Sequence, residues 1–252
     1  MNHEFEDIEV KVNSIQLLRD ALSSKRKRCM IATGSMTDPY IPLEQSENKV
    51  RQSLELIADN GFGFTVITKS DLILRDLDLL SEINRKAKCV VQMTLTTFDD
   101  SLCRIIEPGV CVTSRRVEVL KILHNAGIET VVWLCPVLPF INDTKENIGG
   151  ILNYCVEANV KGIICFGMGM TLREGNREYY YQKLDEYFPG LKNKYISTYA
   201  DSYQLLSPNH PELMKMFYSQ CRKNSIMCNN DEIFRFLSEF ESRELGEQIS
   251  FF

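Results

Sequence analysis

The chain has 252 residues, of which 44% are hydrophobic and 25% are charged, and its net charge is −5. This composition is typical of a globular protein, and the length suits one barrel-sized domain or two small ones. The acidic balance argues against a general nucleic-acid binder, because a phosphate backbone attracts a basic surface.

The N-terminal residues are acidic and contain neither the basic nor the apolar region of a secretory signal. The longest apolar run covers residues 131–141 and contains two prolines. Such a run is too short to span a bilayer. We therefore expect a cytoplasmic protein without a membrane partner.

Nine cysteines are present, but no CxxC or CxxxCxxC spacing occurs anywhere in the chain. An odd number of thiols argues against a disulfide framework. Several of them lie in apolar, strand-like runs, where cysteine usually serves as a small buried hydrophobe. We therefore predict no metal site formed by these residues.

Helix-like and strand-like segments alternate along the first two thirds of the chain. A helix at 14–24 precedes a short apolar strand, and the next helix is predicted to begin with Ser46 as its cap. Helices separate the later strands, and one of them is capped by Thr144. The five predicted strands are 29–32, 64–68, 89–95, 128–134 and 160–166.

The last third is predicted to be helical. It contains a tyrosine-rich helix at 173–187 and further helices at 191–206, 211–223 and 231–241. We divide the chain into a partial (β/α) barrel at 1–206 and a C-terminal helical extension at 207–252 that packs on the barrel.

Strands that are apolar on both faces and separated by helices are typical of a parallel sheet in the α/β class. A complete (β/α) barrel of this type needs eight strands, and only five are predicted. Because a helix precedes the first strand, the strand that would pair beside 29–32 is absent. We therefore predict an incomplete parallel barrel that lacks its first strand, with added C-terminal helices.

Polar side chains follow each predicted strand. Hydroxyls and acids crowd the loop 33–44, and Lys69 and Asp71 follow the second strand. In parallel α/β folds these positions converge on the ligand. Each of them alone is commonly a turn or cap residue, but together they suit a small ligand with an amine, a carboxylate and a ribose.

Five stretches of the chain resemble the radical S-adenosylmethionine proteins of the spore photoproduct lyase-like group. The resemblance extends over about residues 8 to 241. The stretches are GSMTDPYIPLE (34–44), GFGFTVITKSD (61–71), VVQMTLTT (90–97), PVLPFINDT (136–144) and GMGMTLREG (167–175).

The resemblance implies S-adenosylmethionine as the cofactor, an iron–sulfur [4Fe–4S] cluster and lyase-type chemistry. It places the methionyl amine at the loop 33–44, the ribose at the third predicted strand and the adenine after the fourth. Lys69 lies where the methionyl carboxylate or a substrate would be met. The cofactor-binding residues that it implies are Ser35, Thr37, Asp38, Glu44, Lys69, Thr94, Thr96 and Leu138.

The chain departs from the family pattern at its beginning. The CxxxCxxC loop that holds the cluster follows the family's first strand, and neither is found here. We therefore expect a truncated protein that is inactive as given, and we assign no catalytic residue. Repair of DNA photoproducts is not expected, and the sequence names no substrate.

Two other functions stay open at this point. In the first alternative, the protein is a non-catalytic or partner-completed barrel, and the exposed edge of its first strand takes up a strand from a partner or from a second copy. Alternatively, Lys69 forms a Schiff base with a carbonyl substrate, as in an aldolase, while Asp71 or Asp38 transfers protons.

Overall fold

The computed structural model describes residues 8–243, which contain a five-stranded parallel sheet in the order β1-β2-β3-β4-β5. The prediction of an α/β protein with a partial parallel barrel is confirmed, as are the five strands in their predicted places. Their bounds are β1 Met30–Thr33, β2 Gly63–Thr68, β3 Cys89–Thr94, β4 Glu129–Trp133 and β5 Gly162–Ile164.

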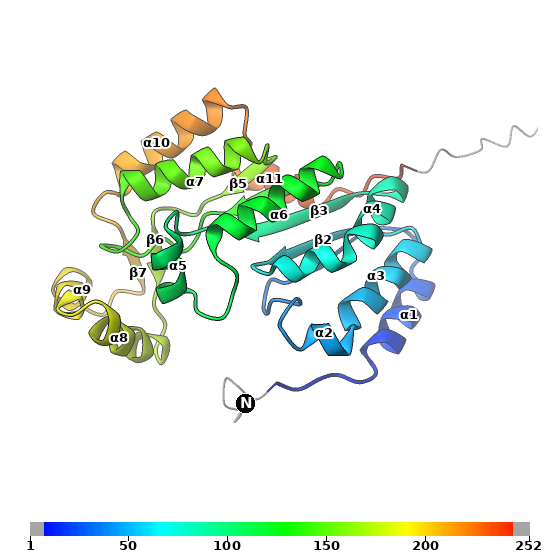
Figure 1. Ribbon diagram of the computed structural model, residues 1–252, viewed down its shortest axis with the longest axis horizontal. Helices are drawn as coiled ribbons and strands as arrows, with labels where there is room; N and C mark the ends of the chain where they lie inside the picture. Colours follow the sequence, from blue (N-terminus) through cyan, green and yellow to red (C-terminus); the bar gives the residue numbers. More distant parts are fainter. Residues whose placement is uncertain (1–7, 244–252) are drawn as a thin grey trace, which may run out of the picture.

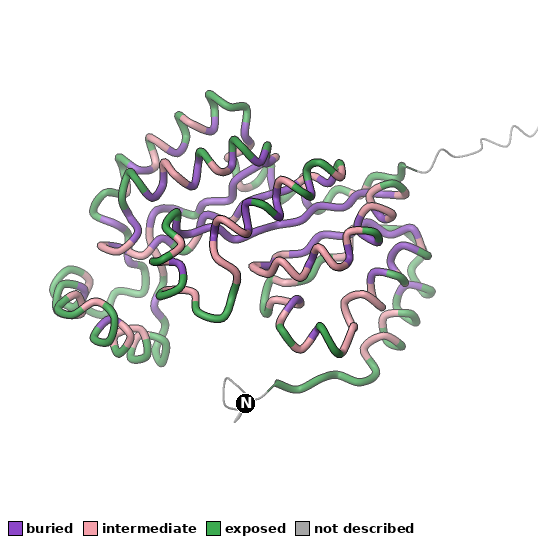
Figure 2. Tube along the Cα trace, viewed as in Figure 1, coloured by how far each residue is buried: buried purple, intermediate pink, exposed green. Residues whose placement is uncertain are grey.

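Helices cover the outer face of this sheet (Figure 1). Side chains of that face, such as Val66, Val91 and Val132, join the helices in one large apolar core. Figure 2 shows that most of the sheet is buried while the outward sides of the helices are exposed. The end of β1, at Ala32 and Thr33, is exposed as well. The helices up to β5 are α1 Ser14–Ser24, α2 Glu44–Glu47, α3 Lys49–Asp59, the 3₁₀ helix η1 Asp71–Asp76, α4 Leu77–Lys86, α5 Asp100–Ile106, α6 Thr113–Asn125 and α7 Lys145–Glu157.

The inner face of the sheet is closed at one end by helix α11 (Asn230–Ser238). Its Ile233 and Leu237 pack on Val90, Val131 and Ile164, which come from three adjacent strands. Side chains alternate between the two faces of a strand, so Gln92 and Thr94 lie on the same inner face as Val90. The opposite end of this face, at the carboxyl ends of the strands, carries the candidate site.

A small module follows β5 and lies beyond the carboxyl ends of the strands (Figure 1). It consists of the antiparallel pair β6 (Gly169–Thr171) and β7 (Gln204–Leu206) with helices α8 (Asn176–Tyr187) and α9 (Leu191–Tyr199). Its own core contains Leu172, Leu184, Tyr195 and Leu205. Helix α10 (His210–Lys223) then returns along α7.

Four predicted helices were wrong in their bounds. The helix predicted at 173–187 begins at Asn176, and the helix predicted at 231–241 ends at Ser238. The helix predicted at 191–206 ends at Tyr199, because Ala200 has a φ of 45° and residues 204–206 pair with β6 as a strand. The helix predicted to begin at Ser46 begins at Lys49, after the separate turn α2. The Ser46 hydroxyl donates to the Leu43 carbonyl oxygen instead of capping that helix. Thr144 caps α7 as predicted.

The two edges of the sheet differ. At the β5 edge, Met227 forms a parallel bridge with Gly162. Strand β1 pairs with β2, and nothing else in residues 8–243 pairs with it as a strand. Within the same residues, no helix is long and apolar enough to cross a bilayer.

The division of the chain at residue 206 stays a prediction. Residues 1–7 of the predicted barrel and 244–252 of the predicted extension lie outside the described residues.

Candidate functional site

The loop after β1 lies directly on the backbone of β2. Gly34 has a φ of 92°, and a Cβ atom at this position would lie 2.1 Å from the Ile67 carbonyl oxygen. Only glycine allows both the backbone conformation and the close approach. The loop is therefore fixed against the end of β2.

Asp38 fastens the same loop to the residues that follow β2. Its carboxylate accepts hydrogen bonds from the backbone N–H of Tyr40 at 2.9 Å and of Lys69 at 2.7 Å. It also accepts one from the Thr68 hydroxyl at 2.8 Å. A ligand amine would share this carboxylate with three internal donors.

Glu44 is buried and supports the start of α3. Its two carboxylate oxygens accept hydrogen bonds from the backbone N–H groups of Lys49 and Val50. One of them also forms an ion pair with Arg75 at 3.0 Å. A carboxylate at this place satisfies free N–H groups and interacts favourably with the helix dipole, so Glu44 already has a structural role.

Ser35 and Thr37 are exposed on the outer side of the same loop. Thr37 and Asp38 line a cavity of about 590 Å³ between this loop and residues 8–14. These two hydroxyls are the predicted ligands of this loop that solvent reaches most freely.

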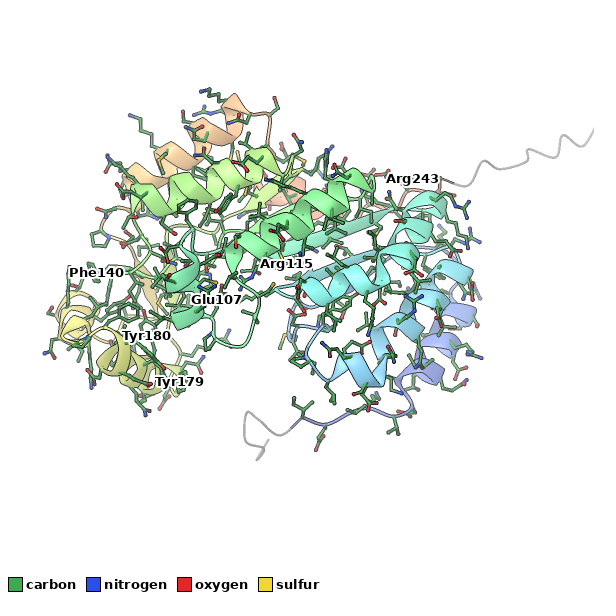
Figure 3. All side chains as sticks on the ribbon, viewed as in Figure 1. Glu107, Arg115, Phe140, Tyr179, Tyr180 and Arg243 are labelled. Atoms are coloured by element: carbon green, nitrogen blue, oxygen red, sulfur yellow. The ribbon has the colours of Figure 1, made fainter. Side chains whose placement is uncertain are left out.

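Lys69 forms an ion pair that the sequence did not predict. Its ammonium lies 2.5 Å from one carboxylate oxygen of Glu107, and the other oxygen lies 2.8 Å from the Arg116 guanidinium. Glu107 follows α5, and Figure 3 shows it between α5 and the beginning of α6. The Arg116 side chain is fully buried, whereas 35% of the Lys69 side chain remains exposed.

The two cations keep Glu107 ionised. Burial alone would raise the pKa of this carboxyl group, but Arg116 and Lys69 outweigh burial and hold the pKa below its usual value. One carboxylate thus lies between two cations, and the cluster carries a net positive charge at the carboxyl edge of the sheet.

Thr94 and Thr96 lie beside this cluster. The Thr94 carbonyl oxygen accepts a hydrogen bond from Arg116 at 3.0 Å, and the Thr96 hydroxyl lies 3.5 Å from Glu107. The Thr96 carbonyl oxygen accepts hydrogen bonds from the side-chain amides of Asn142 and Asn147. The predicted ribose residues are therefore buried and held by several elements.

A polar chain and three aromatic rings occupy the inner face next to Thr94. Gln92 donates to the Thr65 hydroxyl and accepts from the Trp133 indole N–H, each at 2.8 Å. The rings of Trp133, Phe166 and Phe234 lie 6.0–6.3 Å apart between centroids, and 59% of Phe166 is exposed. These three rings form an apolar cluster on the inner face of the partial barrel.

Cys135 lies at the carboxyl end of β4 and lines a second cavity of about 370 Å³ with Phe166 and residues of β6. Burial raises the pKa of its thiol to about 12, and the Lys69 ammonium opposes that rise. Because burial dominates, the Cys135 thiol at the end of β4 stays in its neutral form near neutral pH.

Leu138 lies in a third cavity, of about 200 Å³, between α5, the loop after β4 and α8. Its backbone N–H donates to Asn142 at 2.6 Å. Tyr179 and Tyr180 line the same cavity from α8 (Figure 3). Leu138 thus lies in a different cavity from Thr37 and Asp38.

The structure brings Lys69, Thr94 and Thr96 together and gathers Ser35, Thr37, Asp38 and Glu44 in the loop after β1. Sequence reasoning missed Glu107 and Arg116, because neither follows a strand. A buried acid between α5 and Pro108 gives no recognisable motif, and Arg116 lies inside an amphipathic helix.

Among residues 8–243, no three histidine, cysteine or acidic side chains lie close enough together to hold a metal ion. The cysteines are free thiols that lie in different strands, helices and loops. A [4Fe–4S] cluster needs several thiolates around one site. The residues described here do not fit such a cluster.

A family model for the radical SAM superfamily matches residues 7–155, more than half of the chain. The chain belongs to this superfamily. Membership in this superfamily implies S-adenosylmethionine and a [4Fe–4S] cluster.

Two curated relatives show how far the similarity extends. An uncharacterized protein of Mycobacterium tuberculosis is 27% identical over 209 residues, which cover 82% of this chain and 61% of the relative. A protein of Pseudomonas phage M6 named radical SAM Nalpha-GlyT isomerase is 26% identical over 134 residues, which cover 53% of this chain and 27% of the relative. The chain thus spans about three fifths of the length of the mycobacterial protein.

Among solved structures, spore photoproduct lyase in complex with a dinucleoside spore photoproduct has a similar fold. The TM-score is 0.58 at 10% sequence identity, and the alignment covers 85% of this chain and 64% of the lyase. At this identity the likeness supports the fold alone.

Proposed function

We propose that these residues form the S-adenosylmethionine-binding part of a radical SAM enzyme. Lys69 meets the methionyl carboxylate, Thr94 and Thr96 lie toward the ribose, and Leu138 lies toward the adenine. Ser35 and Thr37 offer hydroxyls to the methionyl amine, while Asp38 and Glu44 contribute negative charge from behind that loop. The observation that carries this proposal is the partly exposed Lys69 ammonium at the carboxyl edge of the sheet, beside Thr94.

The same proposal locates the cluster ligands outside these 252 residues. When bound, a [4Fe–4S] cluster supplies the electron for the superfamily's chemistry. The described residues offer no group of three suitable ligands, and the sequence has no CxxxCxxC. The chain as given is therefore expected to bind the cofactor but to lack radical activity.

Calorimetric titration with S-adenosylmethionine tests the proposal. We expect binding by the unaltered chain and a loss of about tenfold in affinity for Lys69→Met, because a charge-assisted contact with the carboxylate is removed. Lys121→Met is the matched control, since Lys121 pairs with Glu157 on the surface. Equal affinity of the Lys69 variant and the unaltered chain would contradict the assignment of Lys69.

Anaerobic incubation with iron and sulfide tests the location of the cluster ligands. We expect no stable absorption band of an iron–sulfur cluster after desalting. A stoichiometric cluster on this chain would refute that part of the proposal.

A second candidate is a barrel that is completed by another chain. The open side of β1 favours it, because an unpaired parallel edge is a place where a strand from a partner adds. No comparable observation favours the aldolase-type reaction. The Lys69 nitrogen already contacts the Glu107 carboxylate of the protein itself.

A further inference from the structure

The ion-pair cluster of Lys69, Glu107 and Arg116 is more buried than a surface salt bridge. Arg116 is fully buried and donates to the Cys111 carbonyl oxygen at 2.7 Å and to the Thr94 carbonyl oxygen at 3.0 Å. These bonds fix the guanidinium to the end of β3 and to the loop before α6. Glu107 is in turn fixed by Arg116, and its side chain is only 9% exposed.

The backbone of Lys69 is also held on both sides. Its N–H donates to Asp38 at 2.7 Å, and its carbonyl oxygen accepts from the Cys111 thiol at 2.9 Å. A lysine side chain normally loses much rotamer freedom when it binds a ligand. Here Glu107 has already selected the direction of the ammonium before any ligand arrives.

The charges favour an anionic ligand. Arg116 neutralises Glu107 inside the fold, so the positive charge of Lys69 is left without a second carboxylate in the cluster. An ammonium has three donors, and a single Glu107 contact leaves donors for a ligand. A carboxylate of the ligand would complete the coordination of this ammonium.

We propose that Glu107 is a positioning residue that aims the Lys69 ammonium at the methionyl carboxylate of S-adenosylmethionine. This inference rests on the proposed function. Glu107 touches the protein and not the cofactor, and it acts through Lys69. The buried Arg116 holds the Glu107 carboxylate in place through their ion pair.

Affinities for two ligands, measured side by side, distinguish this positioning role from a merely structural one. S-adenosylmethionine and decarboxylated S-adenosylmethionine differ at the carboxylate that Lys69 is proposed to meet. We expect the unaltered chain to prefer S-adenosylmethionine. Glu107→Gln should lose about tenfold in affinity for it and little for the decarboxylated compound. Glu118→Gln, which alters an exposed partner of Arg115, should keep the original preference.

Glu107→Asp covers the case in which the glutamine variant does not fold. Aspartate keeps a negative charge for Arg116, but its side chain is shorter by one methylene group and reaches Lys69 less well. It should lose part of the same preference. A variant that folds and either keeps the full preference or loses affinity equally for both ligands would overturn the role of Glu107.

A measurement without ligand separates this inference from the proposed function. In ¹⁵N NMR spectra of lysine side chains, the ordered Lys69 ammonium should give a signal that disappears in Glu107→Gln and persists in Glu118→Gln. If the unaltered chain shows that signal but binds no S-adenosylmethionine, the proposed function is refuted. The claim that Glu107 orients Lys69 toward the methionyl carboxylate is then refuted as well. If it binds S-adenosylmethionine and shows no such signal, only the role of Glu107 is refuted.

Discussion

At the scale of single residues, the two acids of the loop after β1 have a structural role that does not depend on a ligand. Asp38 and Glu44 were predicted as cofactor residues because they follow a strand. In the structure their oxygens accept hydrogen bonds from the backbone N–H groups of four residues. Bonds to an ionised acceptor are stronger than neutral ones. These acids therefore hold in place the loop on which Ser35 and Thr37 are carried.

Replacement of Asp38 by alanine tests that structural role. Tyr40 N–H, Lys69 N–H and the Thr68 hydroxyl would lose their shared acceptor. We expect the free energy of unfolding to fall by about 3 kcal/mol, as estimated from the loss of several hydrogen bonds to one charged group. Urea denaturation measures this change. The exposed Thr37→Ala should change stability by less than about 0.5 kcal/mol. An Asp38 variant as stable as this control would show that these bonds contribute nothing.

At the scale of secondary-structure elements, one buried lysine joins β3 to the C-terminal helix α11. The Lys88 side chain is only 1% exposed. Its ammonium donates to the carbonyl oxygens of Phe236 and Glu239 and pairs with Glu241 at 2.8 Å. A cation near the last carbonyl groups of a helix also interacts favourably with the helix dipole. Lys88 thus holds the helix that closes the inner face of the sheet.

The variant Lys88→Met should loosen α11 selectively. Methionine keeps most of the side-chain volume, but it leaves the two carbonyl oxygens without their donor. We expect a loss of about 2 kcal/mol in the free energy of unfolding. Amide hydrogen exchange should become faster in residues 230–239 than in β2. The surface variant Lys121→Met should change neither quantity appreciably. Equal protection of α11 in both variants would argue against this role.

At the scale of the whole molecule, the hydrophobic pattern of the sequence predicted the buried strands but not the elements that are formed by contacts distant in sequence. Strands β2 to β5 are largely buried on both faces, so their places in the chain and their parallel arrangement could be predicted from apolar runs such as that of β3. The end of α9 could not, because the turn at Ala200 and the pairing of Leu205 with Met170 depend on contacts distant in sequence. Tertiary contacts override local preference at such points.

Only the residues of the candidate site that lie at the ends of strands could be predicted from the sequence. Lys69 follows β2 and Thr94 ends β3, so both could be located at the carboxyl edge of the sheet from the sequence. Glu107 and Arg116 come from the end of α5 and from within α6, so their meeting with Lys69 depends on how those helices pack. A buried ion-pair cluster whose residues come from three separate segments has no characteristic spacing by which it could be recognised in the sequence.

The open edge of β1 gives the last prediction. Gly63 N–H donates to the Cys29 carbonyl oxygen. In a parallel ladder, the N–H and C=O groups of one residue point to the same side, and successive residues alternate. Cys29, Ile31 and Thr33 therefore face β2, while Met30 and Ala32 direct their backbone groups outward. Ala32 is exposed, and no strand among residues 8–243 pairs with its outward N–H, which we expect to be available to a strand of a partner or of a second copy.

Ala32→Pro removes that outward N–H and leaves the bonds between β1 and β2 in place. We expect the unaltered chain to associate increasingly with concentration in light-scattering measurements, and the proline variant to shift toward the monomer. Ala32→Ser is the matched control, because it keeps the N–H and should associate like the unaltered chain. Circular dichroism checks that all three proteins are folded. A folded, unaltered chain that stays monomeric at every concentration would refute self-association through this edge, because two open edges of the same strand would then fail to pair even where mass action favours them most.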